Sequence, residues 1–355
     1  MTNLLKFLPR IFFSKGDPLQ FIFFITSKCN LSCRHCFYLE KLNGLKDELS
    51  VKEIERISQG MGDLLWLSLT GGEPFLRKDI SEIAEIFYRN TKFGLLTICT
   101  NGILQDQIIR SVSEICRICK GAHVILYVSL DGMKETHDQM RGLRGGFEKA
   151  LDTVRELKKL KKGFKNLNVG TITTCNAENQ KEMGRLALFL KSEIKPDSIS
   201  INLIRGKPRS TCLGEVDLKH YFEFIKIQKE GWATGDFGYF NLLGKTFIQR
   251  RELLQKQVIS TVFKGDRYVI PCLAGNISCV MTETGDLYPC EILDKKIGNI
   301  KDTNYDFKKL WHSTKAAKLR RFIKDTKCYC TYECAITTNI LFNIAQLTKM
   351  FTRKA

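Results

Sequence analysis

The sequence contains no apolar run long enough to span a bilayer, no internal repeat and no low-complexity tract. The first absence excludes a transmembrane helix, and the other two exclude a solenoid and a low-complexity chain. The chain also lacks a leader built from charged, apolar and small-residue segments, and Pro9 interrupts its basic and apolar first thirteen residues. We therefore expect a cytoplasmic globular protein.

Acidic residues are scarce relative to basic ones. The chain has 38 aspartates and glutamates against 56 lysines and arginines, so its formal net charge is +18. This excess indicates an anionic partner, which would be nucleic acid, phospholipid head groups, an acidic substrate or an acidic redox protein. The basic residues are scattered over predicted helices, and this distribution favours a solvated basic surface over a nucleic-acid groove.

Cysteine, by contrast, is abundant, with fourteen residues. In a long chain without a leader, closely spaced cysteines are typical of metal sites rather than of disulfides. Cys29, Cys33 and Cys36 follow the apolar run 21–26 with the spacing C-x3-C-x2-C. Three thiolates are one ligand short of the four that a cubane iron-sulfur cluster takes, so one iron would be open to a small molecule. A zinc knuckle that includes His35 is the alternative.

Short apolar runs alternate with amphipathic stretches from residue 21 onward, which is the pattern of β/α units in a parallel sheet. The pattern predicts strands at 21–26, 65–69, 95–100, 124–130, 169–174 and 198–204, and helices from residue 50 and over 78–91, 105–120, 146–162 and 179–194. The expected fold is α/β, a partial (β/α)6 TIM-like barrel with a small C-terminal cysteine-rich auxiliary domain. Ligands of such sheets bind at the carboxyl ends of the strands.

The alternation ends after residue 204, and the remaining composition suggests further divisions. We expect an N-terminal extension at 1–20, the barrel at 21–205, a helical linker or substrate region at 206–265, the auxiliary domain at 266–335 and an amphipathic helix at 336–355. That last helix gathers apolar residues near one face, namely Ile340, Leu341, Ile344, Leu347, Met350 and Phe351. Packing against the body of the protein is favoured over a membrane-surface helix.

A second motif follows the second predicted strand, where the chain reads Gly71, Gly72, Glu73 and Pro74. Together with the cysteine trio, it resembles the radical S-adenosylmethionine (radical SAM) enzymes, whose GGEP motif binds the amino group of the cofactor's methionine half. In that family the open iron of a 4Fe-4S cluster binds S-adenosylmethionine. The reduced cluster cleaves this cofactor to a 5′-deoxyadenosyl radical, which abstracts hydrogen from a substrate. The resemblance implies that the cysteine trio is catalytic and that a reducing partner such as flavodoxin or ferredoxin supplies the electron.

Polar residues at the ends of the later predicted strands would be helix caps or turn residues if taken singly. By the resemblance, the cofactor-contact candidates are Ser129 and Arg141, then Asn101 and Asp131, and more weakly Thr173 and Asn176. His35 stands where the family usually has an aromatic residue, and an imidazole can still stack on the adenine.

A second group of cysteines lies toward the C-terminus. Cys272, Gly285 and Cys290 have the spacing C-x12-G-x4-C on a predicted β-hairpin, which resembles the opening of the SPASM or twitch auxiliary-cluster domain. Cys330 and Cys334 match the C-x3-C ending of that pattern, but a C-x-C pair at 328–330 replaces its preceding C-x2-C-x5 element.

The resemblance makes six cysteines metal-ligand candidates: Cys272, Cys279, Cys290, Cys328, Cys330 and Cys334. Six thiols suffice for one fully ligated 4Fe-4S cluster but not for two, so we expect one auxiliary cluster. Its first three ligands would be Cys272, Cys290 and Cys334, and the fourth would be one of the other three. A structural zinc is the alternative.

We expect an enzyme that cleaves S-adenosylmethionine reductively and modifies a peptide or protein side chain, as the resemblance to SPASM proteins implies. One alternative is a radical SAM enzyme that acts on a lipid-linked or other anionic small molecule at the membrane surface, as the +18 charge and the apolar, basic ends of the chain suggest. Another is a non-catalytic iron-sulfur protein that transfers electrons or acts as a sensor.

Overall fold

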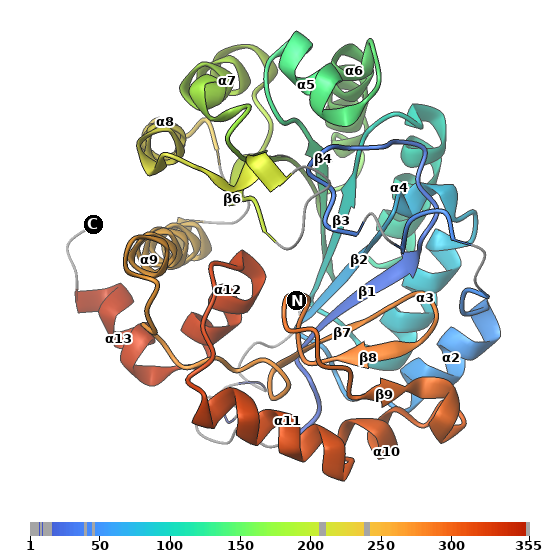
Figure 1. Cartoon of the computed structure of the whole chain (residues 1–355). Coiled ribbons are helices and arrows are strands. Elements are labelled where there is room, and N and C mark those ends of the chain that lie inside the picture. Colours follow the sequence, from blue (N-terminus) through green and yellow to red (C-terminus); the bar gives the residue numbers. More distant parts are fainter. Residues whose placement is uncertain are drawn as a thin grey trace.

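Nine strands form one sheet in the computed structural model, which describes residues 16–38, 41–44, 47–205, 211–237 and 242–352, with residues 7 and 9. The strands are β1 (Gln20–Thr26), β2 (Trp66–Gly71), β3 (Leu95–Thr100), β4 (His123–Ser129), β5 (Leu167–Cys175), β6 (Ser198–Leu203), β7 (Ser278–Met281), β8 (Asp286–Tyr288) and β9 (Gly298–Asn299). Their order across the sheet is β6-β5-β4-β3-β2-β1-β7-β8-β9 (Figure 1).

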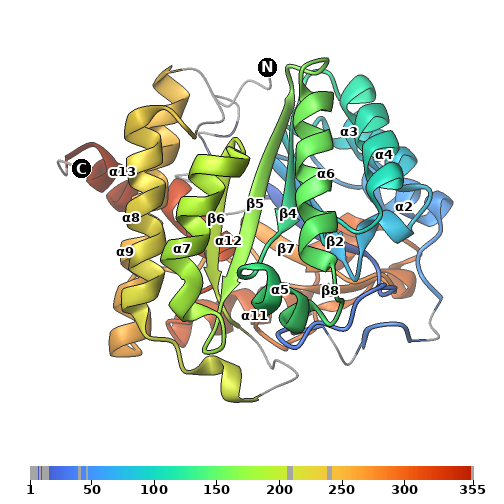
Figure 2. The ribbon, with the colours of Figure 1, turned by 90° about the horizontal axis from the view of Figure 1, so that it is seen from above.

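The six predicted parallel strands are confirmed, because β1 to β6 pair in parallel with their neighbours. The helices are α2 (Val51–Gln59), α3 (Ile80–Thr91), α4 (Gln105–Ile118), α5 (Lys134–Arg141), α6 (Gly146–Lys161), α7 (Met183–Phe189), α8 (Leu218–Thr234), α9 (Leu242–Gly265), α10 (Phe307–Trp311), α11 (Thr314–Asp325), α12 (Glu333–Leu341) and α13 (Ile344–Thr352). Figure 2 shows α6 alongside β4 and β5, and α8 alongside β6. The predicted partial (β/α)6 barrel is the fold of residues 20–203.

Alternation along β1 divides its side chains between two apolar clusters, because successive strand residues point to opposite faces. Phe21 and Phe23 lie in the main core together with Phe87. Ile22 and Phe24 face a smaller cluster that includes tyrosines from two other segments. The strand that precedes the cysteine loop is therefore buried on both faces.

The C-terminal cysteine-rich segment continues the barrel sheet. Strand β7 pairs with β1 in parallel, with Phe21 opposite Cys279, and β8 pairs with β7 in the predicted antiparallel hairpin. Cys272 and Cys290 lie just outside the two strands of this hairpin. The sheet thus runs across the domain boundary that we placed between residues 205 and 266, while the division into domains remains a prediction.

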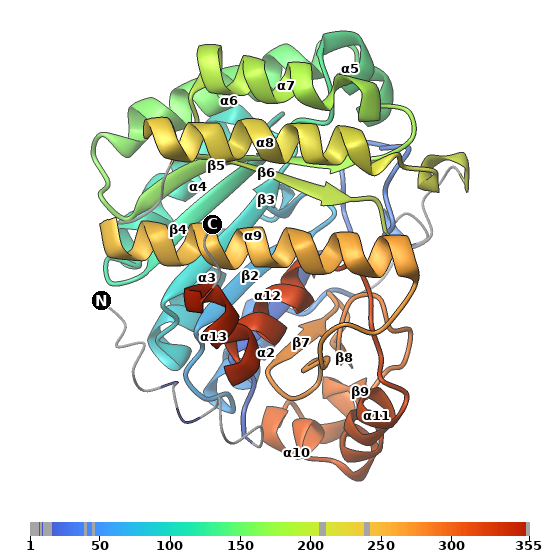
Figure 3. The same ribbon diagram turned by 90° about the vertical axis from the view of Figure 1, so that its left-hand side faces the viewer.

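Side chains close the free edge of β6, where the described part of the chain supplies no further strand. Gln228 Nε2 donates to the Ile199 carbonyl over 2.5 Å, and Lys256 Nζ donates to the Ile201 carbonyl over 2.6 Å. The Leu203 amide donates to Glu333 Oε1 over 3.0 Å. Helices α8, α9 and α12 supply these groups, and Figure 3 shows α9 lying across this side of the sheet. The alternate backbone groups of β6 are thereby hydrogen-bonded without a neighbouring strand.

The prediction of one amphipathic helix over residues 336–355 is wrong in the helix bounds. Two helices, α12 and α13, replace it, and residues 342–343 separate them. Leu347 and Met350 pack into the core, whereas Ile344, which we expected on the same apolar face, is 47% exposed. Within the described residues, no helix has the length and apolar composition needed to cross a membrane. The preference for packing against the body of the protein is confirmed for α13.

We predict that Lys256→Met lowers the free energy of unfolding by about 2–4 kcal/mol, since it leaves the Ile201 carbonyl without its donor and removes one of the two cations near the buried Glu333. Denaturant unfolding of anaerobic protein would measure this loss. Lys159→Met on the exposed face of α6 is the matched control, and it should change the free energy by less than about 0.5 kcal/mol. Equal effects of the two changes would contradict the role of Lys256 at the β6 edge.

Candidate functional site

The cysteine loop leaves β1 and is tied to the neighbouring strand ends. The amide of Cys29 donates to Asn43 Oδ1 over 2.9 Å, and Asn101 Nδ2 donates to Asn30 Oδ1 over 2.7 Å. Further along, the Arg34 amide donates to the Met140 carbonyl over 2.9 Å. The last two contacts come from the ends of β3 and α5, so the loop lies where ligands of a parallel sheet bind.

The three thiols of this loop affect one another electrostatically. Burial raises the pKa of Cys29 to about 11, with smaller contributions from the charges of Cys33 and Cys36. Burial also raises the pKa values of Cys33 and Cys36. Thiolates held this close repel one another, and an iron-sulfur cluster relieves that repulsion because it brings positive charge. The donor set fits a cluster with one iron that lacks a cysteine ligand.

Single metal ions fit the structure less well than a cluster. Among the residues that the structure describes, no three Cys, His, Asp or Glu side chains are grouped tightly enough to hold one ion. A four-iron cluster takes thiolates that are farther apart, since each thiolate binds a different iron. The zinc alternatives for both cysteine groups are therefore not supported by the geometry.

The two glycines of the GGEP turn allow β2 to approach the cysteine loop. Gly71 has φ +142°, and a Cβ atom there would lie 2.3 Å from the Thr26 carbonyl oxygen. A Cβ atom on Gly72 would lie 2.1 Å from the Lys28 carbonyl oxygen. The Gly72 and Glu73 amides donate to those two carbonyls over 2.8 Å. The two glycines thus allow close contact between the GGEP turn and the chain that leads into the cysteine loop.

The Glu73 carboxylate is inside the protein rather than exposed to a ligand. It is 1% exposed and accepts hydrogen bonds from the Asn101 amide and the Thr100 hydroxyl, both over 2.8 Å. Burial raises its pKa to about 7, although these hydrogen bonds lower it. Its carboxylate therefore holds the end of β3 against the end of β2. Contact of the GGEP motif with the cofactor's amino group stays a prediction.

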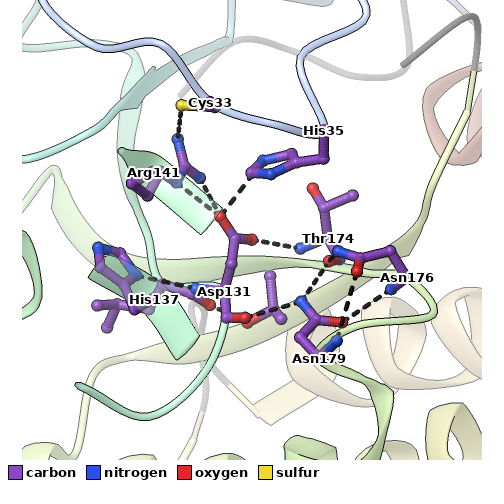
Figure 4. A network of polar contacts seen from close by, with 10 residues as sticks. Cys33, His35, Asp131, His137, Arg141, Thr174, Asn176 and Asn179 are labelled. Carbon is purple, nitrogen blue, oxygen red and sulfur yellow. Dashed lines mark hydrogen bonds and ion pairs between the residues drawn. The ribbon is translucent and has the colours of Figure 1, made fainter. Parts of the chain in front are cut away.

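Asp131 is the centre of a buried polar network beside the cysteine loop (Figure 4). Its Oδ2 accepts from Arg141 Nε over 2.6 Å and lies 3.4 Å from His35 Nε2. Its Oδ1 accepts from the Thr174 amide over 2.8 Å, and its carbonyl accepts from Asn179 Nδ2 over 2.7 Å. Burial raises the pKa of Asp131, but the Arg141 charge, the two neighbouring histidines and the Thr174 amide together outweigh burial, and the pKa lies below its usual range. Asp131 thus remains an anion and orients its neighbours.

Arg141 and His35 extend this network to the cysteine loop. Arg141 Nη1 lies 3.7 Å from Cys33 Sγ and donates to it, so one guanidinium touches both Asp131 and a cysteine (Figure 4). Burial lowers the pKa of His35 to about 4, which makes its imidazole neutral near pH 7. The structure thus brings together Arg141, Asp131 and His35, which the sequence analysis named separately.

The other predicted strand-end residues have mainly structural partners. Asn101 Oδ1 accepts from the Ile103 amide over 3.0 Å, and the Thr173 hydroxyl donates to the Leu130 carbonyl over 2.6 Å. Asn176 Oδ1 accepts from the Glu178 amide in a turn. Ser129 is half-buried at the end of β4. These residues frame the site, and their contact with a cofactor remains a prediction.

Sequence reasoning missed the residues that hold Asp131. His137 Nδ1 accepts from the Asp131 amide over 3.2 Å, and Asn179 reaches the same residue from beyond β5 (Figure 4). One pattern was available: His137 and Arg141 are four residues apart and so share one face of a helix. Nothing local in the sequence indicates Asn179, because its partner lies 48 residues away.

Four of the six C-terminal cysteines form a second group. They are Cys272, Cys290, Cys328 and Cys330. A hydrogen bond between the Cys272 and Cys328 thiols raises the pKa of Cys272 and lowers that of Cys328 to about 7. Cys330 is influenced by the charges of Cys290 and Cys328, and burial raises its pKa to about 12. Four thiols match the ligand number of a fully ligated cluster.

Cys279 and Cys334 are placed differently from this group. Cys279 is fully buried in β7 and belongs to the main apolar core, where Arg320 is its charged neighbour. Cys334 lies near Cys99 and Arg205. Cys334 packs against the same small cluster as Cys330, and the choice of auxiliary ligands among these cysteines stays a prediction.

Aromatic residues lie between the two cysteine groups. Tyr38, which closely follows Cys36, stacks against Phe24 with ring centroids 4.6 Å apart and donates a hydrogen bond to the buried Glu283. Tyr332 belongs to the same cluster, as do the partly buried Cys36 and Cys330. The two groups are therefore connected through one packed layer.

Models of known protein families match both segments that contain the cysteine groups. The Radical SAM superfamily model matches residues 23–190, and the SPASM iron-sulfur cluster-binding domain model matches residues 272–335. An AdoMet-dependent heme synthase from Methanosarcina barkeri is 28% identical over 86% of this chain and 85% of its own length. The subtilosin biosynthesis protein AlbA from Bacillus subtilis is 24% identical over 88% of this chain and 66% of its own length.

Solved structures show the same fold. Native anSMEcpe with bound AdoMet and the Cp18Cys peptide has a TM-score of 0.59 and 19% sequence identity, and the match covers 90% of this chain and 88% of that one. At 19% sequence identity, this similarity shows a shared fold alone.

We predict that Asp131→Asn weakens S-adenosylmethionine binding at least tenfold, about 1.4 kcal/mol, because Arg141 and His35 lose the anion that orients them. Equilibrium dialysis of iron-loaded protein would measure the affinity. Glu178→Gln removes the more exposed ion pair with Arg34 and is the control, with an expected change below about twofold. Unchanged affinity in Asp131→Asn would contradict its orienting role.

Proposed function

Because this chain belongs to the radical SAM superfamily and is an enzyme of its SPASM-containing branch, we propose that Cys29, Cys33 and Cys36 hold its 4Fe-4S cluster and leave one iron for S-adenosylmethionine. The observation that supports this assignment is the grouping of these three thiols on one loop, with the Arg141 guanidinium 3.7 Å from Cys33 Sγ. When bound, the cluster and the cofactor supply a radical that abstracts hydrogen from a substrate.

The residues of this chain would bind and orient the cofactor. Arg141, held by Asp131, places a positive charge beside Cys33, where it would neutralise the cofactor's carboxylate. His35 presents a neutral ring on the same loop. Glu73 keeps the ends of β2 and β3 together and so fixes the GGEP turn against the cysteine loop. The surrounding burial excludes water from a reactive intermediate.

We further assign the auxiliary 4Fe-4S cluster of the SPASM segment to Cys272, Cys290, Cys328 and Cys330. Their mutual influence and the separate placement of Cys279 and Cys334 support this choice. Such a cluster would either accept an electron from the substrate radical or bind the substrate.

A peptide or protein side chain is the substrate class that we propose first. AlbA takes part in biosynthesis of the bacteriocin subtilosin, and it matches 88% of this chain. The anSMEcpe structure with the same fold holds a peptide together with AdoMet.

An anionic small molecule is the second candidate, and two observations favour it. The heme synthase from Methanosarcina barkeri matches most of both chains. The net charge of +18 would also attract a substrate with several carboxylates.

Formation of 5′-deoxyadenosine tests the enzymatic proposal. Anaerobic, iron-loaded protein given dithionite and S-adenosylmethionine should form it, whereas Cys33→Ala should not. Deuterium transfer into 5′-deoxyadenosine from labelled peptides or from a labelled iron porphyrin would then separate the two substrate classes. Loaded wild-type protein that forms no 5′-deoxyadenosine under these conditions would contradict the proposal.

Iron analysis tests the auxiliary ligands. We predict that Cys328→Ser loses about four irons per chain, because it removes one ligand of the auxiliary cluster. Cys279→Ser, in the apolar core, should retain the wild-type iron content. The reverse result, with iron lost from Cys279→Ser and retained in Cys328→Ser, would overturn this ligand set.

A further inference from the structure

Arg205 follows β6 and contacts several segments that are distant in sequence. Its Nη2 donates to Glu291 Oε2 over 3.2 Å, and its Nη1 lies 3.9 Å from Glu333 Oε2. The guanidinium carbon lies 5.0 Å from the ring centroid of Phe37 and 4.6 Å from that of Tyr332. One side chain therefore combines an ion pair with stacking against two aromatic rings.

The neighbours of Arg205 stand next to the proposed cluster ligands in the sequence. Phe37 follows Cys36, Glu291 follows Cys290, and Tyr332 is two residues after Cys330. The guanidinium thus touches one residue beside the radical-cluster loop and two residues beside the auxiliary ligands. Lys41 also lies over one ring from each segment, those of Tyr38 and Tyr288, whereas Arg205 combines its two ring contacts with an ion pair to Glu291.

The Arg205 and Glu291 charges are poorly screened by solvent. The side chains are 19% and 6% exposed, respectively. In such surroundings a charge acts strongly on its neighbours, and removal of one partner leaves the other uncompensated. A lysine could replace the charge but not the planar group that stacks between two rings.

We propose that Arg205 is a positioning residue that joins the radical-cluster loop to the auxiliary segment and, through its ion pair with Glu291, sets the charge around the auxiliary cluster. This inference rests on the proposed function, because it requires a cluster at Cys272, Cys290, Cys328 and Cys330. Reduction adds negative charge to a cluster, so a nearby cation raises the reduction potential and a nearby anion lowers it.

A redox titration followed by electron paramagnetic resonance tests the inference on full-length, iron-loaded protein. The auxiliary signal is the one that persists in Cys33→Ala. Arg205→Met should shift the auxiliary potential downward, because Glu291 then lacks its cation. Glu291→Gln should shift it upward, and the double variant should return toward the wild-type value. A purely structural role predicts shifts in the same direction, or cluster loss, in both single variants.

Controls separate failure of this inference from failure of the proposed function. Arg155→Met removes a positive charge from an exposed position on α6 and should leave the potential unchanged. If Arg205→Met does not load iron, Arg205→Lys and Glu291→Gln still test the sign of the effect, and the lysine variant should show a smaller downward shift. Shifts of equal sign, or none in loaded variants, would overturn the role of Arg205. Absence of any auxiliary signal from loaded wild-type protein would instead overturn the ligand assignment.

Discussion

Strand β1 is hydrogen-bonded to β2 on one side and to β7 on the other, and the site depends on this placement. The cysteine loop leaves β1, the GGEP turn leaves β2 and the auxiliary hairpin begins with β7. Because β1 and β2 run in parallel, the cysteine loop and the GGEP turn emerge at the same edge of the sheet, whereas Cys272 precedes β7 and Cys290 follows the antiparallel β8, toward the amino end of β7. Pairing of β1 with both neighbours thus brings the two cysteine groups close enough to share one aromatic layer.

Charge compensation is the second constraint on the interior. Asp131 is fully buried beside Arg141, and Glu333 is buried among Lys256 and Arg205. Both of these carboxylates have a cation and a backbone donor, as the cost of an unpaired buried charge requires. The thiol groups have too little positive charge nearby to be ionised together, and iron-sulfur clusters would supply it. The need to compensate buried charge therefore applies to both the polar networks and the cysteine groups.

Local patterns in the sequence predicted the barrel strands and the cysteine motifs, because periodicity and spacing are local properties. They could not show that β7 pairs with β1, since no local pattern encodes a neighbour more than 250 residues away. The break before α13 was missed because the apolar spacing continues across it. The polar network of Asp131 was also missed: its position at a strand end suggested cofactor contact, which stays a prediction, and the structure adds its contacts with Arg141 and His35. Cys279 could have been recognised as a core residue, since alternation along its strand buries it beside Met281.

Anomalous diffraction at the iron edge from anaerobic crystals would test the central claim most directly, because it locates iron relative to individual sulfur atoms. The account predicts two four-iron clusters, one bonded to Cys29, Cys33 and Cys36 with a fourth iron free of cysteine, and one bonded to Cys272, Cys290, Cys328 and Cys330. Iron bonded to Cys279 or Cys334 in place of Cys328 or Cys330 would contradict the auxiliary site. Four cysteine ligands on the first cluster, or a single zinc ion in its place, would contradict the account as a whole.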